Sequence, residues 1–255
     1  MTTIWQKHYH QQHYEVRTAG NSVRLYKDGV LHSQFNERQP ITGQVWDLLL
    51  LPTFFYPQQQ IKRILVLGVG GGTVIRQLNL FFKPEKIIGI DLDPIHLNIA
   101  KRFFGLNKQK NVSLHCDDAK AWLNEYTGPP FDIIIEDIFS EENGQPVRAI
   151  DANSSWAKSI LRHLSLHGAV ISNFTSAQEA KQSAFIHNVK IRSRFQSHYL
   201  LGCCRNENIV GAFLKHASSH KMLKQNLRRF PALDTRRKTC RLDYRLLNLA
   251  PQQAN

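Results

Sequence analysis

The stretch "ILVLGVGGGTVIRQL", residues 64–78, constrains the fold more than any other part of the chain. An apolar run comes first, then the alternate glycines Gly68, Gly70 and Gly72, and then a segment with helical character. Glycine allows a sharp turn and lets a ligand approach the backbone without meeting a Cβ. The helix after such a turn points free N–H groups at that ligand. The pattern therefore predicts a strand, a turn and a helix that together hold a nucleotide.

Further apolar runs continue this pattern along the chain. They are "KIIGID", "NVSLHC", "FDIIIED" and "GAVISNF", and they alternate with expected helices near 72–82, 94–104, 118–125 and 153–163. Continuous apolar strands are typical of a sheet that is covered on both faces. Strand–helix alternation predicts a parallel, doubly wound α/β sheet with right-handed crossovers. "FQSHYLLGCC" and "NIVGAFLKHA" lack a helix between them, so we expect an antiparallel pair at the edge.

The sequence before this region indicates a different, smaller unit. Residues 14–35 form short alternating runs separated by Gly20-Asn21 and Asp28-Gly29, which predicts an antiparallel meander. "ITGQVWDLLLLP" follows as a helix that Pro52 ends. We expect three parts: a small N-terminal β meander plus helix (1–52), a Rossmann-like domain (53–215) and a basic C-terminal extension (216–255).

Charge is concentrated near the C-terminus. The formal net charge is +13, and residues 215–245 contain ten Lys/Arg against Asp234 and Asp243. A basic stretch of this kind fits nucleic-acid binding, and it equally fits a solvated surface. No run of 18 uncharged apolar residues exists, and the N-terminus lacks an apolar signal core, so we expect a cytoplasmic protein without membrane association. The four cysteines form no C-x-x-C pair, which indicates free thiols and no metal site.

The glycine spacing distinguishes between nucleotide ligands. A dinucleotide turn has the form G-x-G-x-x-G, and its third glycine would fall on Thr73. G-x-G-x-G fits the ribose and methionine part of S-adenosylmethionine instead. Asp91 ends the second strand of the series, where a carboxylate can accept hydrogen bonds from both ribose hydroxyls. Asp93 precedes Pro94 and is expected to cap a helix.

Acidic residues also follow the next two strands. After "NVSLHC", Asp118 is a candidate acceptor for the adenine amino group, and Asp117 is either a second acceptor or a helix cap. After "FDIIIE", Asp137 lies where a transferred group would be, so it could bind an amine or take its proton, or simply cap a loop. Carboxylates at successive carboxyl ends of strands indicate a cofactor crevice. Asp132, at the start of its strand, is expected to be structural.

The order of these elements resembles the spermidine synthases, or polyamine aminopropyltransferases, and their methyltransferase-fold relatives. The resemblance runs over roughly residues 20–215, through "KDGVLHS", "ILVLGVGGGTVIRQL", "IIGIDLDP", "CDDAKAWL", "FDIIIEDIFS" and "ILRHLSLHGAVISNF". It implies a small N-terminal β-domain and a seven-stranded class I methyltransferase sheet. It also implies that Asp91 holds the ribose, Asp118 the adenine, and that Asp137 occupies the catalytic-acid position.

The chain departs from the synthase pattern where an acceptor amine would bind. The Asp of the synthase turn G-G-G-D-G-G-T becomes Gly70, and the second Asp of D-S-S-D-P becomes Ser140. The Gln that follows D-G-x-x falls on His32, and no Tyr-x-Glu-Met segment is present. Buried polyamine charges need matching carboxylates. Only Glu136, Glu141 and Glu142 remain as substitutes.

Three functions stay open at this point. The first is an S-adenosylmethionine-dependent methyltransferase that acts on an unknown small-molecule acceptor. The second is an aminopropyltransferase that uses decarboxylated S-adenosylmethionine and the polyamine putrescine. The third is a non-catalytic protein that binds an adenosyl ligand or nucleic acid. A homodimer is compatible with each of them.

Overall fold

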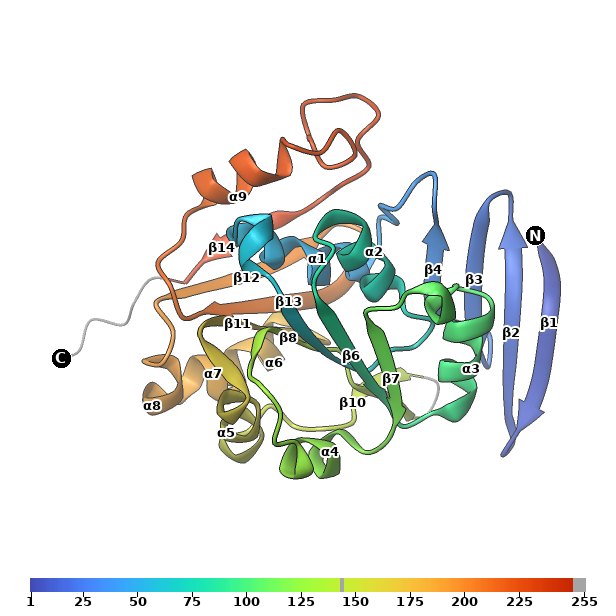
Figure 1. Cartoon of the computed structure of the whole chain (residues 1–255), viewed down its shortest axis with the longest axis horizontal. Coiled ribbons are helices and arrows are strands. Elements are labelled where there is room, and N and C mark those ends of the chain that lie inside the picture. The colour runs from blue at the N-terminus through green and yellow to red at the C-terminus, as the bar shows by residue number, and fades with distance from the viewer. Residues whose placement is uncertain (143–144, 250–255) are drawn as a thin grey trace.

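The computed structural model describes residues 1–142 and 145–249 (Figure 1). Its main element is a mixed sheet of eight strands. In spatial order these are β14 (Arg245–Asn248), β12 (Ser197–Cys203), β13 (Asn206–Leu214), β11 (Leu164–Phe174), β8 (Phe131–Glu136), β5 (Arg63–Leu67), β6 (Lys86–Asp91) and β7 (Val112–Cys116). Strands β11, β8, β5, β6 and β7 are parallel, which confirms the Rossmann-like α/β fold class.

The edge of this sheet differs from the sequence expectation. β12 and β13 form the expected antiparallel pair, but β14 pairs with the outer side of β12 through Tyr199 and Asn248. The sheet therefore has eight strands rather than seven, and its edge strand is β14 instead of a member of the predicted pair. β14 is a run of four residues, Arg-Leu-Leu-Asn, of which three are exposed, so it is too short for the period on which strand prediction depends.

Both faces of the sheet are covered, as the continuous apolar strands predicted. In β5, Ile64 and Val66 face one hydrophobic cluster, and Leu65 and Leu67 face the other. The first face is covered by α1 (Val45–Leu50), the 3₁₀ turn η1 (Leu51–Phe55), α2 (Thr73–Phe81) and α9 (His220–Leu227). The second face is covered by α4 (Ala119–Glu125), α5 (Ser154–Arg162), α6 (Ala177–Gln182), α7 (Ala184–His187) and α8 (Val189–Arg192). Alternation of side chains along each strand explains the two clusters.

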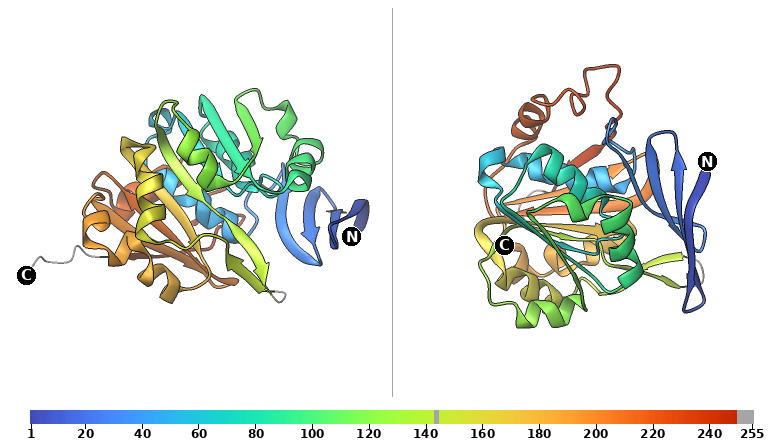
Figure 2. Two further views of the ribbon diagram at one scale, coloured as in Figure 1. Left: turned by 90° about the horizontal axis from the view of Figure 1, so that it is seen from below. Right: turned by 45° about the vertical axis from the view of Figure 1, so that its right-hand side comes forward.

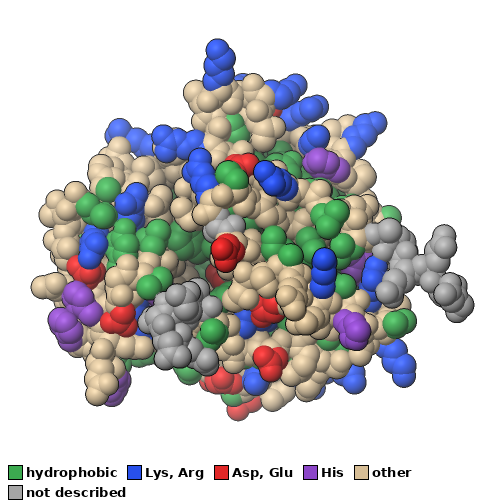
Figure 3. Space-filling model, turned by 180° about the vertical axis from the view of Figure 1, so that it is seen from behind, with side chains coloured by type: hydrophobic (Ala, Val, Ile, Leu, Met, Phe, Trp, Pro, Cys, Tyr) green, Lys and Arg blue, Asp and Glu red, His purple; other side chains and the backbone are tan. Residues whose placement is uncertain are grey.

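The described part of the basic C-terminal segment packs on the α/β domain. Leu223 and Leu227 of α9, together with Leu233 and Leu242, are buried in the first cluster. Lysine and arginine side chains gather along the upper part of the molecule in Figure 3, where Figure 1 places α9 and the loop after it. The segment thus combines an apolar inner side with a basic outer side. The three-part division of the chain stays a prediction.

The N-terminal unit is an antiparallel sheet of four strands: β1 (Thr2–Tyr9), β2 (Gln12–Ala19), β3 (Ser22–Lys27) and β4 (Val30–Asn36). The predicted meander corresponds to β2–β4, and β1 adds a strand that the polar N-terminal sequence did not indicate. Asp28 and Gly29 have positive φ values of 48° and 83°, as the β3–β4 turn requires. The sheet packs against α3 (Pro94–Arg102), as Figures 1 and 2 show.

A separate hairpin, β9 (Phe139–Glu142) and β10 (Gln145–Arg148), follows β8. The short turns η2 (Gln58–Gln60) and η3 (Leu106–Lys108) complete the described elements. No helix in the described ranges is long and apolar enough to cross a membrane. The four cysteines are free thiols, as their spacing predicted.

Candidate active site

The glycine turn lies at the carboxyl ends of β5 and β8. A Cβ at Gly68, whose φ is +87°, would collide with the backbone carbonyl of Asp137. The Asp137 amide in turn donates to the Leu67 carbonyl at 2.8 Å. Glycine at position 68 therefore lets the turn and the loop after β8 come into direct contact. Gly72 is the left-handed residue from which α2 starts, with a φ of 86°.

Asp91 holds the glycine turn in place. Its Oδ2 accepts from the amides of Val69 and Gly70, each at 2.8 Å, and its Oδ1 accepts from Asp93 N at 2.9 Å. Burial alone would raise the pKa of this carboxyl, but His96 and the backbone donors outweigh it and lower the pKa. A carboxylate has about four acceptor positions. The three backbone donors leave one such position for a ribose hydroxyl, and the ribose-binding role of Asp91 stays a prediction.

The N-terminal sheet also holds the turn. Ser33 Oγ on β4 accepts from the Gly71 amide at 2.7 Å, and the Thr73 hydroxyl exchanges hydrogen bonds with the backbone of Gln34. These contacts occupy the Gly71 N–H group and the Thr73 hydroxyl at the start of α2, which a ligand could otherwise use. Sequence reasoning missed Ser33, because a serine in a predicted strand carries no signal of a contact across two units.

Two histidines lie beside Asp91. His96 places Nδ1 3.7 Å from Asp91 Oδ1 and Nε2 3.7 Å from Asp93 Oδ2. His32 on β4 is 5.4 Å from His96 between ring centres. Burial, with the charge of His96 and Lys27, lowers the pKa of His32 to about 4, so its ring is neutral near pH 7. Within the described residues, the Nε2 atoms of both rings are buried without a hydrogen-bond partner. Buried orphan nitrogens of this kind suit a polar ligand group.

The acids after β6 and β7 divide between capping and ligand positions. Asp93 caps α3 by accepting from Ile95 and His96, as predicted, and it also accepts from Tyr14 Oη at 2.6 Å. Asp118, not Asp117, caps α4. The cap bonds use Asp118 Oδ1, and Asp117 Oδ1 accepts from the amide of Asp118. The second carboxylate oxygen of each residue is outside these bonds, so both stay candidates for an adenine amino group.

Leu92 is a residue that sequence reasoning did not single out. It directly follows Asp91 and is 71% exposed, in a chain whose other strand-end leucines are mostly buried. An exposed apolar side chain beside a ribose-binding candidate offers a surface for the face of an adenine ring. The sequence signal was its position between two aspartates, where an apolar residue is not needed for the core.

Glu136 ends β8 and Asp137 follows it, and the two acids have different environments. Glu136 is fully buried and paired with Arg148, whose Nη2 lies 2.6 and 2.8 Å from its two oxygens. Ser172 also donates to Glu136, and Arg148 Nε lies 3.2 Å from Glu179 Oε1. Glu136 is therefore neutralised inside the protein and does not offer a free charge to an acceptor. The side chains of Glu141 and Glu142 lie outside the described part.

Among the described residues, the Asp137 side chain has one hydrogen bond, from Asn173 Nδ2 at 2.8 Å. Burial raises its pKa to about 6; Asn173 and Arg148 act in the opposite direction, while Glu136 and Asp91 raise it further. The charge of Asp91 reaches Asp137, so the two acids lie near each other at the carboxyl edge of the sheet. Asp132 accepts from the amides of Lys62 and Arg63 at the amino end of the sheet, so its predicted structural role is confirmed.

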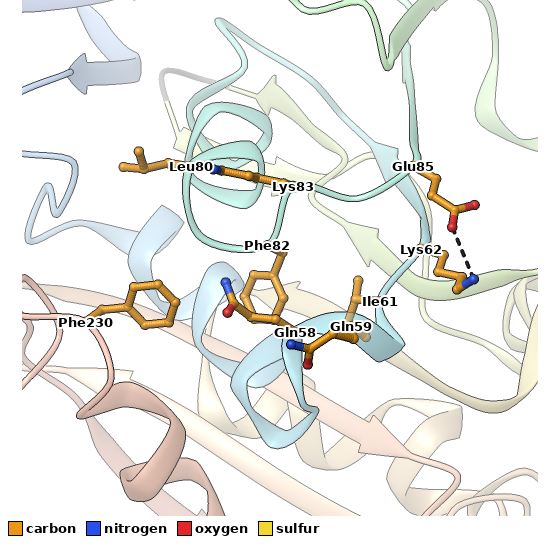
Figure 4. A pocket seen from close by; sticks show the side chains of 9 residues that line it. All are labelled: Gln58, Gln59, Ile61, Lys62, Leu80, Phe82, Lys83, Glu85 and Phe230. Carbon is orange, nitrogen blue, oxygen red and sulfur yellow. Dashed lines mark ion pairs between the residues drawn. The ribbon is translucent and has the colours of Figure 1, made fainter.

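The structure also contains a pocket of about 490 Å³, lined by Phe82, Phe230 and Ile61 among others (Figure 4). Lys62 and Glu85 form an ion pair at its rim, with 3.1 Å between Nζ and Oε1. Lys62 and Glu85 immediately precede β5 and β6, so the pocket lies at the amino edge of the sheet, away from the carboxylates. We place the site at the carboxyl edge because the acids, the glycine turn and the two histidines with unbonded Nε2 atoms meet there.

Known proteins combine this fold with two kinds of chemistry. A polyamine aminopropyltransferase 2 of Caldanaerobacter subterraneus subsp. tengcongensis is 27% identical over 180 residues, which cover 69% of this chain and 58% of that protein. An eEF1A lysine and N-terminal methyltransferase homolog of Drosophila pseudoobscura pseudoobscura is 27% identical over 96 residues, 36% of this chain and 14% of that protein. The match thus spans little more than half of the first relative and a small part of the second.

A probable spermidine synthase from Corynebacterium glutamicum has a similar structure, with a TM-score of 0.70 and 16% identity. The similarity covers 89% of this chain and 86% of that one, and at this identity it shows the fold alone. The family model of the spermine/spermidine synthase domain matches residues 47–199, a range that contains the glycine turn, Asp91, Asp118 and Asp137. The chain belongs to the spermine/spermidine synthase family.

Proposed function

We propose that this protein is a methyltransferase that uses S-adenosylmethionine and a small acceptor without multiple positive charges. The observation that carries the proposal is the buried ion pair between Glu136 and Arg148. It leaves Asp137 as the carboxylate at the end of β8 that is not in an ion pair with a described residue. Gly70 stands where the resembling synthases have an acid, so a second carboxylate is missing from the turn as well.

The charge balance explains why a polyamine fits poorly. An ammonium group that leaves water needs a carboxylate partner, and a diamine needs two. Arg148 adds a guanidinium whose side chain is 2% exposed just beside this position. A polycationic acceptor would meet that charge at short range, and of the two acids Glu136 and Asp137 only Asp137 is outside a described ion pair. A neutral amine or an acceptor with a single positive charge requires no carboxylate partner besides Asp137.

The residues present fit an adenosyl donor. Asp91 has an acceptor position left for the ribose, Leu92 offers an apolar surface, and Asp117 and Asp118 each keep a free carboxylate oxygen. A bound S-adenosylmethionine would supply the electrophilic methyl group on its sulfonium. The protein's contribution is to hold the acceptor in line, and Asp137 can orient an amine and accept its proton. With a pKa of about 6, Asp137 is mostly ionised at pH 7 to 8, as a base requires.

An assay of aminopropyl transfer tests this proposal. The protein is incubated with decarboxylated S-adenosylmethionine and putrescine, and spermidine formation is measured by chromatography. We expect no spermidine above the amount formed without protein, while S-adenosylmethionine binds in a parallel titration. Steady spermidine formation that depends on putrescine concentration would refute the methyltransferase proposal.

The second candidate is an aminopropyltransferase. The family match and the retained acid at position 137 favour it. It requires that carboxylates other than Glu136 balance the second ammonium of putrescine. The same assay distinguishes the two functions, because an aminopropyltransferase needs the decarboxylated donor.

A further inference from the structure

We propose that Asn173 and Asn208 are positioning residues that aim one oxygen of Asp137 at the acceptor and keep this carboxylate ionised. The acceptor in this inference comes from the proposed function, whereas the contacts around Asp137 are independent of that function. Asn173 is near the end of β11 and is 2% exposed. Its Nδ2 donates to Asp137 Oδ1 at 2.8 Å, and its Oδ1 accepts from Asn208 Nδ2 at 3.1 Å.

The order of these hydrogen bonds fixes the direction of the Asn173 amide. A carboxamide has a donor end and an acceptor end. Because Asn208 donates to the oxygen of Asn173, the nitrogen of Asn173 must point to Asp137. An isolated asparagine could turn over and present its oxygen, which would repel a carboxylate. Asn208 therefore favours, together with the carboxylate itself, the orientation in which Asn173 donates to Asp137.

The backbone holds the pair in register. Asn173 on β11 is opposite Val210 on β13, which brings Asn208 to the carboxyl edge of the sheet beside Asn173. The backbone carbonyl of Asn173 accepts from Arg148 Nη1, so the same residue is tied to the Glu136–Arg148 pair. Three strands, β8, β11 and β13, thus contribute to one fixed geometry. The carbonyl contact does not depend on the side chain at position 173, so it survives substitution.

This arrangement has two consequences for Asp137. Among the described contacts, Oδ1 accepts the Asn173 hydrogen bond and Oδ2 accepts none, so Oδ2 is the oxygen left for the acceptor. Glu136 and Asp91 face Asp137 with negative charge and oppose its ionisation, as does burial. The Asn173 amide favours the ionised form of Asp137, and so does Arg148, which also pairs with Glu136 and Glu179. Without the amide, the carboxyl would hold its proton at a higher pH and act poorly as a base.

The experiment measures the ionisation of Asp137 directly. Protein labelled with ¹³C at the aspartate side-chain carboxyl is titrated by NMR, and the Asp137 signal is identified by its loss in Asp137→Asn. Asn173→Leu removes the donor with little change in volume and should raise the midpoint by about one to two units, the value of a hydrogen bond to a charged group. Asn208→Leu should raise it by less, because Asn173 then loses only its orientation. Asn173→Asp should raise it too, because a carboxylate replaces the donor.

The matched control is Asn111→Leu. Asn111 also forms two side-chain amide hydrogen bonds, to Asn79 Oδ1 and to the Pro84 carbonyl, but next to the start of β7 at the other edge of the sheet. We expect a loss of stability without a shift of the Asp137 midpoint. A purely structural role for Asn173 would give the same result as this control. If Asn173→Leu does not fold, Asn208→Leu carries the test, since Asn208 is only half-buried.

Donor titrations on the same variants separate this inference from the proposed function. A shifted midpoint in a protein that binds no adenosyl donor would support the positioning pair and refute the function. Normal donor binding with an Asp137 midpoint unchanged in both Asn173→Leu and Asn208→Leu would refute the positioning pair and leave the function standing.

Discussion

Replacing Asp91 by Asn should weaken donor binding while the glycine turn stays folded. The asparagine oxygen can still accept from Val69 N and Gly70 N, which in the native chain reach a single carboxylate oxygen at 2.8 Å each. The other carboxylate oxygen, which accepts from Asp93 N at 2.9 Å and has one position left for a ribose hydroxyl, becomes an NH₂ group. One hydrogen bond to a charged acceptor is lost in the complex, worth about 1.5–3 kcal/mol. This corresponds to an affinity loss of about 10- to 150-fold.

Isothermal titration with S-adenosylmethionine measures this loss, and urea unfolding measures the accompanying change in stability. The Asp93 amide loses its acceptor, so we expect the free energy of unfolding to fall by about 1–3 kcal/mol. Asp93→Asn is the matched control, because Asn also caps helices and Asp93 faces α3 and Tyr14 rather than the crevice. Unchanged donor affinity in folded Asp91→Asn would refute the assignment of the ribose site.

Three further predictions concern other parts of the molecule. The pKa of Asp137 is raised from 3.8 to about 6, so its contribution to stability is present below pH 3.8 and lost as the pH rises through 6. In urea unfolding, the stability of Asp137→Asn relative to wild type should therefore rise by about 1.4 kcal/mol from pH 5 to pH 8. A stability difference that stays constant over this range would contradict the raised pKa. Gly70→Asp restores the synthase-like acid at a φ of +52°; it should cost about 1–2 kcal/mol of stability and give no putrescine turnover, whereas a clear gain would favour the aminopropyltransferase. If the basic surface binds duplex DNA, the double change Arg228→Glu and Arg229→Glu should lower affinity and flatten its salt dependence by about 0.9 per lost phosphate contact; a surface that is only solvated would show neither.

The parts of the fold with strong periodicity could be predicted from the sequence. Local signatures mark the strand from Ile64 to Leu67 and the glycine turn, because buried parallel strands are continuously apolar and tight turns need glycine. Asp91 is marked by its place at the end of the next apolar strand. β1 and β14 were missed for the opposite reason. Both are edge strands with mostly exposed residues, and their pairing depends on a neighbour that is distant in sequence.

The candidate site was only partly predictable. The carboxylates follow their strands, so their place at one edge could be derived from topology. Their partners could not be derived, because Arg148, Asn173 and Ser33 come from three separate elements. The neutralisation of Glu136 is therefore invisible in the sequence, although it decides which acceptor charge the crevice can accommodate. The choice of Asp118 rather than Asp117 as the cap likewise depends on where α4 begins.

The donor preference tests the central claim most directly. Calorimetric titrations with S-adenosylmethionine and with its decarboxylated form, under identical conditions, give two dissociation constants for the same protein. A methyltransferase crevice in which Gly70 replaces the acid should bind the carboxylated form at least about tenfold more tightly, a difference of about 1.4 kcal/mol. Tighter binding of the decarboxylated form would contradict the account and identify the protein as an aminopropyltransferase.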